Sequence, residues 1–414
     1  MKNTSVKTIL ACLPAVIAVL LLVVFVTLFM RGREVHEVIR MDSGWRVTFA
    51  DSVLEDVTLS ELPELLGRRL QKGEELRLEQ SIPGEIHESP TLEMLINYFA
   101  AEVFLDGERI AAPAFERYSA GYYVGGSRYF INLPAEHAGK TLSLVLYAGE
   151  NGLKPVLYPP RLGEFHDLIH VMIGHYGYAL LIGIFMCLFG GFFLLFSLFV
   201  SVLLPEIRGQ RVSSLLSILF GVWILTHYRI LTVVTGGAWN MTVEYIAFYA
   251  CLPLLYHLVS RIRETNRIFR AMQMITTGGV LLSVLLHSTG ILYMHRLRYA
   301  YYVLCTAFLA LLLTMFVTDL KQKRMRALDI IQMAAPTLFC LSIFIAMIIN
   351  LPSGEDIEVQ TVSIVILTTG PLLFAMTRFL IYNWMMMEAA PQKFAFASLQ
   401  QMAYTDSLTG LKNR

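Results

Sequence analysis

Seven long apolar segments follow one another between Tyr178 and Tyr382, with only short polar breaks between them. Each is close to the ~20 residues that a helix rising ~1.5 Å per residue needs to cross ~30 Å of hydrocarbon. Backbone groups inside a membrane must bond to one another, and apolar runs of this length, with Gly and Pro among them, do so as helices. The sequence therefore predicts an α-helical seven-transmembrane bundle, with segments at residues 178–204, 212–234, 242–260, 272–293, 299–317, 330–351 and 361–382.

The breaks between these segments alternate in charge. The breaks after the first, third and fifth segments are basic, with Arg208, Arg211, Arg261, Arg263, Arg267, Arg270, Lys321, Lys323, Arg324 and Arg326. The other breaks carry no Lys or Arg, except for Arg296 and Arg298, and the last of them holds Glu355, Asp356 and Glu358 instead. Because cytoplasmic loops keep Lys and Arg, the bundle is expected to be entered from outside and to end in the cytoplasm.

The composition leaves room for one soluble domain. Of the 414 residues, 56% are hydrophobic. A set of membrane helices plus one soluble domain of ordinary size accounts for this composition. Residues 31–165 hold 14 Lys and Arg against 21 Asp and Glu, and an acidic segment gives no footprint for nucleic acid. Neither a disulfide nor a metal site is predicted, because all five cysteines lie in apolar segments: Cys12, Cys187, Cys251, Cys305 and Cys340.

The chain before the bundle divides into two parts. Residues 1–30 are expected to form an uncleaved signal-anchor helix, because the apolar run after Lys2 and Lys7 is long and lacks small residues at its end. Residues 31–165 have the pattern of short strands separated by turns, which predicts an extracytoplasmic all-β sandwich. In one strand the leucines 142, 144 and 146 share a face, and Asp106-Gly107 is a hairpin turn signal.

One stretch of this β region resembles a known pattern. Ala-Ala-Glu-Val-Phe-Leu-Asp-Gly-Glu-Arg-Ile at residues 100–110 has a Trp-containing strand upstream and a Leu-alternating strand downstream, and it resembles a galactose-binding-type jelly roll. That resemblance implies a sensor domain for carbohydrate or another small extracellular ligand. Aromatic rings in a Gly-rich segment are candidates for stacking on sugar faces, namely Tyr118, Tyr122, Tyr123 and Tyr129. The alternative is that these rings belong to the sandwich core.

Charged residues inside an apolar bundle are expensive and therefore informative. Arg229 and Glu244 lie near the outer ends of consecutive segments, so they are candidates for an ion pair that acts as a switch; Arg229 otherwise extends to the interface. Gly370-Pro371 is the best hinge candidate, because Pro371 removes a helix hydrogen bond. His166 and His170 share a helix face before the bundle, but two histidines without a third ligand predict an interfacial helix and no metal site.

The carboxyl-terminal eleven residues read Tyr-Thr-Asp-Ser-Leu-Thr-Gly-Leu-Lys-Asn-Arg, from residue 404 to residue 414. They closely resemble the opening of a GGDEF diguanylate cyclase domain, which follows a signalling helix with the pattern Asp-x-Leu-Thr-Gly-Leu-x-Asn-Arg. The matching positions are Asp406, Leu408, Thr409, Gly410, Leu411, Asn413 and Arg414. By this resemblance Asn413 contacts the guanine of GTP, and Asp406 and Arg414 belong to the structural turn at the domain entrance.

Together these parts resemble the bacterial seven-transmembrane receptors with diverse intracellular signalling modules. The expected domains are residues 1–30, 31–165, 166–383 for the bundle, 384–404 for a cytoplasmic signalling helix, and 405–414 for the start of a truncated GGDEF domain. The resemblance implies an inner-membrane homodimer that senses an extracytoplasmic ligand and makes cyclic di-GMP from two GTP with Mg²⁺.

The chain itself stops before any catalytic loop, so the cyclase would belong to a longer parent protein. Two other hypotheses stay open. One is a non-enzymatic receptor with a degenerate GGDEF domain that binds nucleotide or a protein. The other is a transporter or channel, although the sequence has no internal repeat and no matched pair of broken helices.

Overall fold

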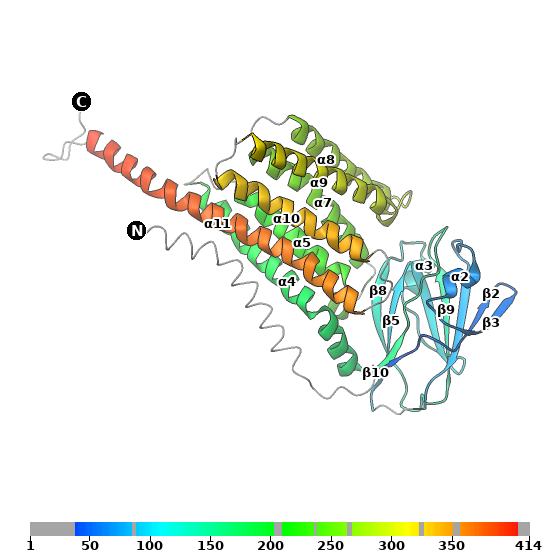
Figure 1. The fold of residues 1–414 in the computed structure, drawn as a ribbon. Coiled ribbons are helices and arrows are strands. Elements are labelled where there is room, and N and C mark those ends of the chain that lie inside the picture. Colours follow the sequence, from blue (N-terminus) through cyan, green and yellow to red (C-terminus); the bar gives the residue numbers. More distant parts are fainter. Residues whose placement is uncertain are drawn as a thin grey trace.

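The computed structural model describes residues 38–84, 88–202, 209–235, 237, 239–262, 267–322, 327–350 and 357–404. A β-sandwich and a helical bundle follow each other along the chain, and the sandwich lies against one end of the bundle (Figure 1). The predicted signal anchor and the GGDEF-like residues 405–414 lie outside the described residues.

Two antiparallel sheets form the sandwich. The four-stranded sheet has the order β1 (Ile39–Arg40), β10 (Arg161–Glu164), β5 (Pro90–Asn97) and β8 (Gly126–Asn132). The six-stranded sheet has the order β3 (Ser52–Val57), β2 (Trp45–Phe49), β4 (Glu75–Ser81), β9 (Thr141–Ala148), β6 (Phe99–Leu105) and β7 (Glu108–Ala111). Short helices α2 (Leu62–Leu66) and α3 (Phe115–Ser119) lie in the connections. The predicted all-β sandwich is confirmed at this level.

Alternation along the strands builds the sandwich core, as expected for sheets with one buried face. Leu142, Leu144 and Leu146 of β9 are all buried in a core that also contains Trp45. The predicted hairpin at Asp106-Gly107 joins β6 to β7, with φ of 48° and 85° at its two residues. Positive φ at both central positions is what a tight hairpin turn requires.

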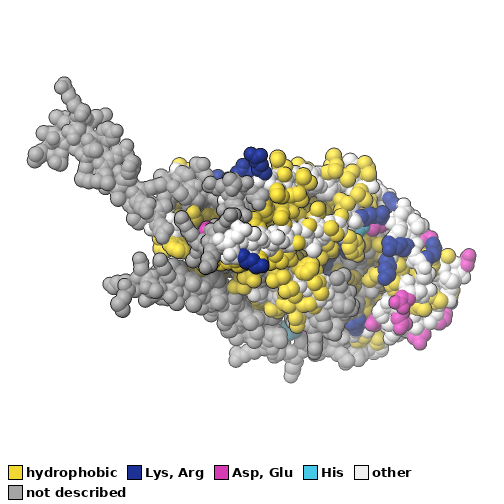
Figure 2. Space-filling model, turned by 45° about the horizontal axis from the view of Figure 1, so that its top comes forward, with side chains coloured by type: hydrophobic (Ala, Val, Ile, Leu, Met, Phe, Trp, Pro, Cys, Tyr) yellow, Lys and Arg dark blue, Asp and Glu magenta, His cyan; other side chains and the backbone are white. Residues whose placement is uncertain are grey.

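The bundle contains α4 (Phe165–Val200), α5 (Gln210–His227), α6 (Thr232–Thr235), α7 (Asn240–Ile262), α8 (Arg267–Ser288), the 3-10 helix η2 (Met294–Leu297), α9 (Arg298–Lys321), α10 (Ala327–Asn350) and α11 (Ile357–Tyr404). Within the described residues, six of these helices are long and apolar enough to cross a membrane: α4, α7, α8, α9, α10 and α11. Figure 2 shows hydrophobic side chains over much of the bundle surface, whereas acidic side chains gather on the sandwich. These features are those of a multi-pass membrane protein.

Helix α5 accounts for the difference from the seven predicted spans. It packs against α4, α7 and α11, and it buries Ser213, Ser214, Ser217 and Thr226 among them. A helix surrounded by protein needs less apolar surface than one that faces lipid, so its hydropathy is lower. The predicted segment 212–234 is also too long, because α5 ends at His227 and the chain turns before α6.

Prolines lie inside α7, α10 and α11, and these three helices nevertheless remain continuous. Pro253 cannot donate to the carbonyl of Tyr249 in α7, and the hydroxyl of Tyr301 in α9 lies 3.0 Å from that carbonyl and satisfies it. Pro371 lies within α11, next to Gly370, where the helix passes close to Leu338 and Ser342 of α10.

Helix α11 is one helix of 48 residues, or about 72 Å at ~1.5 Å per residue. The predicted last span and the predicted signalling helix 384–404 are therefore continuous rather than separate elements. The carboxyl-terminal part of α11 projects beyond the bundle at the end opposite the sandwich (Figure 1).

Candidate functional site between the sandwich and the bundle

The four-stranded sheet turns its outer face towards the bundle. Strand β8 contacts α6 and α7, and β5 and β10 contact α4. Phe130 of β8 packs on Phe165 of α4 with ring centroids 5.3 Å apart. A Cβ atom at Gly126 would overlap the Asn97 side chain of β5 and would also lie 2.9 Å from the end of the Met241 side chain of α7. The sheet face is thus covered by helices and is not a free surface.

A buried ion cluster stabilises this covered face. Arg128 of β8 pairs with Glu93 of β5, and their side chains are 5% and 3% exposed. The guanidinium of Arg128 also lies 5.7 Å from the ring centroid of Tyr176 in α4. Burial of both partners means that neither charge is solvated by water, so each depends on the other.

Glu150, in the loop after β9, joins the sandwich to η2 of the bundle. Its Oε1 lies 2.8 Å from Nε2 of His295, and its Oε2 lies 3.3 Å from Nη2 of Arg296. Arg296 also donates to the carbonyl of Asn151 at 2.5 Å. Both Glu150 and His295 are buried. We call Glu150, His295 and Arg296 the Glu150 latch.

Two tyrosines of the sandwich extend the latch into the bundle. The ring of Tyr98 lies 4.4 Å from that of His295, and its hydroxyl lies 3.5 Å from the hydroxyl of Tyr245 in α7. Tyr123 places its hydroxyl 3.4 Å from Nδ1 of His295, and its ring packs edge-on to His287. Burial raises the pKa of Tyr123 well above its ordinary value, so this hydroxyl stays neutral.

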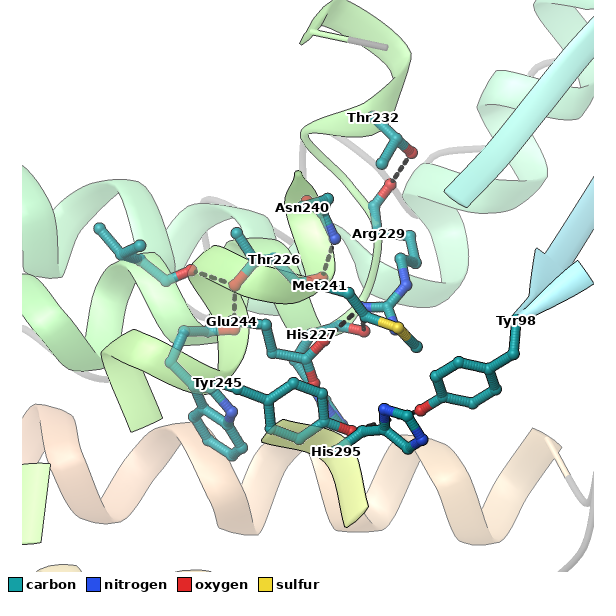
Figure 3. Close-up of polar contacts among 12 residues, drawn as sticks. Tyr98, Thr226, His227, Arg229, Thr232, Asn240, Met241, Glu244, Tyr245 and His295 are labelled. Carbon is teal, nitrogen blue, oxygen red and sulfur yellow. Dashed lines mark hydrogen bonds and ion pairs between the residues drawn. The ribbon is translucent and has the colours of Figure 1, made fainter. Parts of the chain in front are cut away.

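Next to Tyr245, Glu244 forms the centre of a buried network (Figure 3). Its Oε2 lies 2.5 Å from Nη1 of Arg229, and its Oε1 lies 2.9 Å from Nδ1 of His227. The predicted contact between Arg229 and Glu244 is therefore present in the structure.

The backbone around Arg229 explains how the pair forms. Arg229 has φ 56°, in the left-handed region, so the chain reverses directly after α5 and the side chain folds back. Its Nη1 donates to the Thr226 carbonyl at 2.7 Å, and Asn240 donates to the same carbonyl at 2.8 Å. The end of α5 is thus closed by side chains from the following segment.

The four candidate ligand tyrosines are not brought together. Tyr129 points into the sandwich core, and Tyr123 belongs to the interface just described. Tyr122 is 65% exposed and lies 5.8 Å from the Arg117 guanidinium. Tyr118 stacks on Tyr147 with centroids 5.5 Å apart, on the six-stranded sheet.

The six-stranded sheet has an outer face, which the bundle does not cover. This face combines aromatic rings with charged side chains. Tyr147 donates to Glu102 at 2.8 Å, and Arg109 pairs with the same carboxylate at 2.7 Å. Burial and the bond to Glu102 raise the pKa of Tyr147 to about 12. Tyr147 is also paired in register with Glu75 of the neighbouring strand β4. Glu75 lines a hollow of about 320 Å³ whose other residues are Thr48, Phe49, Ala50, Arg68, Glu74 and Arg77. We call Phe115, Tyr118, Tyr147 and this hollow the outer face.

Among the described residues, one group has the spacing of metal ligands: Glu164, His166 and Asp167, whose ligand atoms lie within 4.8 Å of one another. Both carboxylates are already paired with the ring of His166, at 3.2 Å and 3.0 Å. Mutual pairing accounts for the group, and His170 is not part of it.

Sequence reasoning missed Tyr98, Glu150 and His295. Nothing in the local pattern around Tyr98 or Glu150 distinguishes them from other sandwich residues. His295 did carry a signal, because it stands beside Arg296 in a break of the set that otherwise has no Lys or Arg. That exception to the charge pattern is explained by the acidic partner on the sandwich.

Comparisons with known proteins leave the family open. No family model matches the chain, and no curated protein matches it. Among solved structures, a GH2 β-galacturonidase from Eisenbergiella tayi bound to galacturonate is similar over 32% of this chain and 25% of that chain, with 11% identity and a TM-score of 0.23. This chain therefore spans a quarter of that chain's length. A likeness at this TM-score identifies neither fold nor ligand, and the sandwich assignment rests on the strand pairing.

Proposed function

We propose that this protein is a signalling receptor in which the sandwich binds a ligand outside the membrane and α11 carries the response to the other side. The observation that carries the proposal is the contact between Tyr98 and Tyr245, because Tyr245 is adjacent to the buried pair of Glu244 and Arg229. A change in the sandwich therefore reaches a charged network inside the bundle through direct contacts.

The charge pattern of the breaks favours a sandwich outside the bacterial inner membrane and a carboxyl terminus in the cytoplasm. Helix α11 supports transmission, since it packs along α10, α4 and α5 and then continues as one helix past the bundle. A ligand shifts such a system only by its preference for one helix arrangement over another.

The ligand we favour is a carbohydrate or another small polar molecule, bound at the outer face. Aromatic rings supply stacking area there, and Glu102, Arg68 and Arg77 supply hydrogen-bonding charges beside them. The ligand residues that we propose are therefore Tyr118 and Tyr147, while Tyr122 serves as a control.

The output we favour is the synthesis of cyclic di-GMP by a GGDEF domain that residues 405–414 would open, with Asn413 at the guanine. Such a domain would use GTP and Mg²⁺, and a homodimer would bring two nucleotides together. The alternative is a receptor whose degenerate GGDEF domain binds nucleotide or a protein without turnover.

The experiment uses the parent protein in nanodiscs with GTP, Mg²⁺ and a glycan panel, and it measures cyclic di-GMP together with glycan binding. We expect turnover that changes with one glycan, and loss of that response in Tyr147→Ala with retention in Tyr122→Ala. Glycan binding without turnover, in folded protein that binds GTP, would select the degenerate receptor. Absence of glycan binding would reject the carbohydrate, and equal responses of the two variants would reject the outer face.

A further inference from the structure

One buried arginine of the bundle has no acidic partner. Three arginines are buried in the described part of the chain, and two of them pair with carboxylates, Arg128 with Glu93 and Arg229 with Glu244. The third, Arg378 of α11, is 3% exposed, and no carboxylate of the described residues forms an ion pair with it. A charge buried in a membrane bundle is costly unless an opposite charge compensates it. Arg378 therefore calls for an anion that the described chain does not supply.

Neutral groups hold the Arg378 guanidinium at the first turn of α5. Its Nε donates to Oγ of Ser213 at 3.2 Å, and its Nη2 donates to the hydroxyl of Tyr382 at 2.7 Å. The same hydroxyl lies against the backbone of Gly209, the residue before α5, where a Cβ atom would overlap it. Helix α4 leads away from the sandwich to this turn (Figure 1). The charge of Arg378 thus lies beside the amino terminus of α5, at the end of the bundle away from the sandwich.

Several hydrogen-bonding groups at this turn have no partner. Nη1 of Arg378, Nε of Arg211 and Oγ of Ser214 are all buried and unpaired. The amide of Gln210 also has an unpaired atom, Oε1, which a half-turn of the amide would exchange for a donor. Gly209 caps α5 without a side-chain oxygen for the first backbone amides, and these amides form the positive end of the helix dipole. Two arginines and a helix amino terminus therefore favour a negative group at one place.

We propose that this turn binds a phosphate group, with Arg378 and Arg211 as its charged ligands. A phosphate supplies the missing negative charge, and its oxygens accept from the unpaired donors. The phosphate comes from the head group of an anionic phospholipid or from free phosphate. Basic pockets between membrane helices bind such head groups on the cytoplasmic side, where the charge pattern of the breaks is expected to place this turn. Because Arg378 belongs to α11 and Arg211 to α5, a bound phosphate would hold the two helices together.

The test reconstitutes the full chain in nanodiscs of phosphatidylcholine and follows thermal unfolding in two arms. In the first arm, phosphatidylglycerol replaces a rising share of the phosphatidylcholine. In the second, inorganic phosphate is added to pure phosphatidylcholine nanodiscs at constant ionic strength. We expect the unfolding temperature to rise in one of the arms, because a ligand that binds only the folded state stabilises it, and the arm that responds identifies the source. No rise in either arm would overturn the proposal.

Variants distinguish this site from general attraction of anions to a basic surface. Arg378→Met removes the buried charge, whereas Arg261→Met removes an exposed arginine from the last turn of α7. We expect Arg378→Met to lower the apparent affinity for the responding phosphate source by about tenfold or more, and Arg261→Met to leave it unchanged. Arg211→Gln, at a partly exposed side chain, gives the same comparison if Arg378→Met does not fold. Affinity that is unchanged in Arg378→Met or in Arg211→Gln, or that falls equally in Arg261→Met, would overturn the proposal.

Discussion

Oε2 of Glu244 lies 2.5 Å from Nη1 of Arg229, and both side chains are more than nine-tenths buried. Thr226 and His227 supply the remaining contacts of the pair, at the point where α5 ends and the chain reverses. Removing one partner of such a pair leaves the other charge buried without compensation.

Glu244→Gln is therefore expected to lower the free energy of unfolding by about 3–5 kcal/mol. Thermal unfolding of the detergent-solubilised protein measures the change. The matched control is Arg46→Ala, which breaks an exposed pair with Glu55 and is expected to change stability by less than about 1 kcal/mol. Equal effects of the two variants would show that the Glu244 pair contributes nothing beyond a surface contact.

The Glu150 latch is expected to hold the sandwich against η2. Glu150→Gln removes the negative charge that His295 and Arg296 share, so backbone amides of η2 and of β8 should exchange hydrogen faster, while those of β9 stay protected. Hydrogen exchange read by mass spectrometry measures this. Glu136→Gln, an exposed glutamate of the same domain, is the control, and identical exchange in both variants would argue against the latch.

Tyr301→Phe is expected to destabilise α7 without changing the shape of the side chain. The variant removes the hydroxyl that satisfies the Tyr249 carbonyl left free by Pro253, which costs about 1 kcal/mol. Unfolding in mixed micelles measures the loss. In a Pro253→Ala background α7 recovers its own hydrogen bond, so the effect of Tyr301→Phe should shrink there; an unchanged effect would contradict this explanation.

A side chain at position 370 is expected to destabilise the packing of α11 on α10. A Cβ atom there would overlap Ser342 and lie 3.3 Å from the Leu338 carbonyl, so Gly370→Ala should cost about 1–3 kcal/mol through overpacking. Ser342→Gly in the same chain should restore much of the stability. Gly191→Ala on α4, where a Cβ meets nothing within 4 Å, is the control without a clash, and it should stabilise the helix by up to about 1 kcal/mol in the same unfolding assay.

The contribution of the outer face to the stability of the fold should depend on pH. The bond from Arg109 lowers the pKa of Glu102 below its ordinary 4.5, so the ionised carboxylate stabilises the fold above about pH 4.5 and loses this effect as pH falls through the folded value. Glu102→Gln should therefore cost about 0.5–1 kcal/mol at pH 7 and progressively less in acid. Hydrogen exchange of β6 and β9 across pH measures it, with correction for intrinsic rates. A cost that grows in acid would have the wrong sign.

Local patterns in the sequence were sufficient for the long membrane helices and for several strands of the sandwich. Apolar length predicted the membrane helices, and alternation in residues 141–147 predicted the buried face of β9, because both patterns depend on neighbours along the chain. The same reasoning placed Arg229 and Glu244 within reach of each other, since a short connection joins their helices. The same reasoning counted α5 as a seventh membrane span, because the sequence does not reveal that the Ser-rich face of this helix is covered by protein.

The Glu150 latch and the aromatic contacts around it were decided by tertiary structure alone. Tyr98 and Tyr245 are 147 residues apart, and Glu150 is 146 residues from Arg296. Such contacts depend on how the four-stranded sheet lies on the helix ends, which no periodicity encodes. Hydropathy and turn chemistry thus determined which segments fold and into what, whereas the packing of the sandwich on the bundle decided which of their side chains meet.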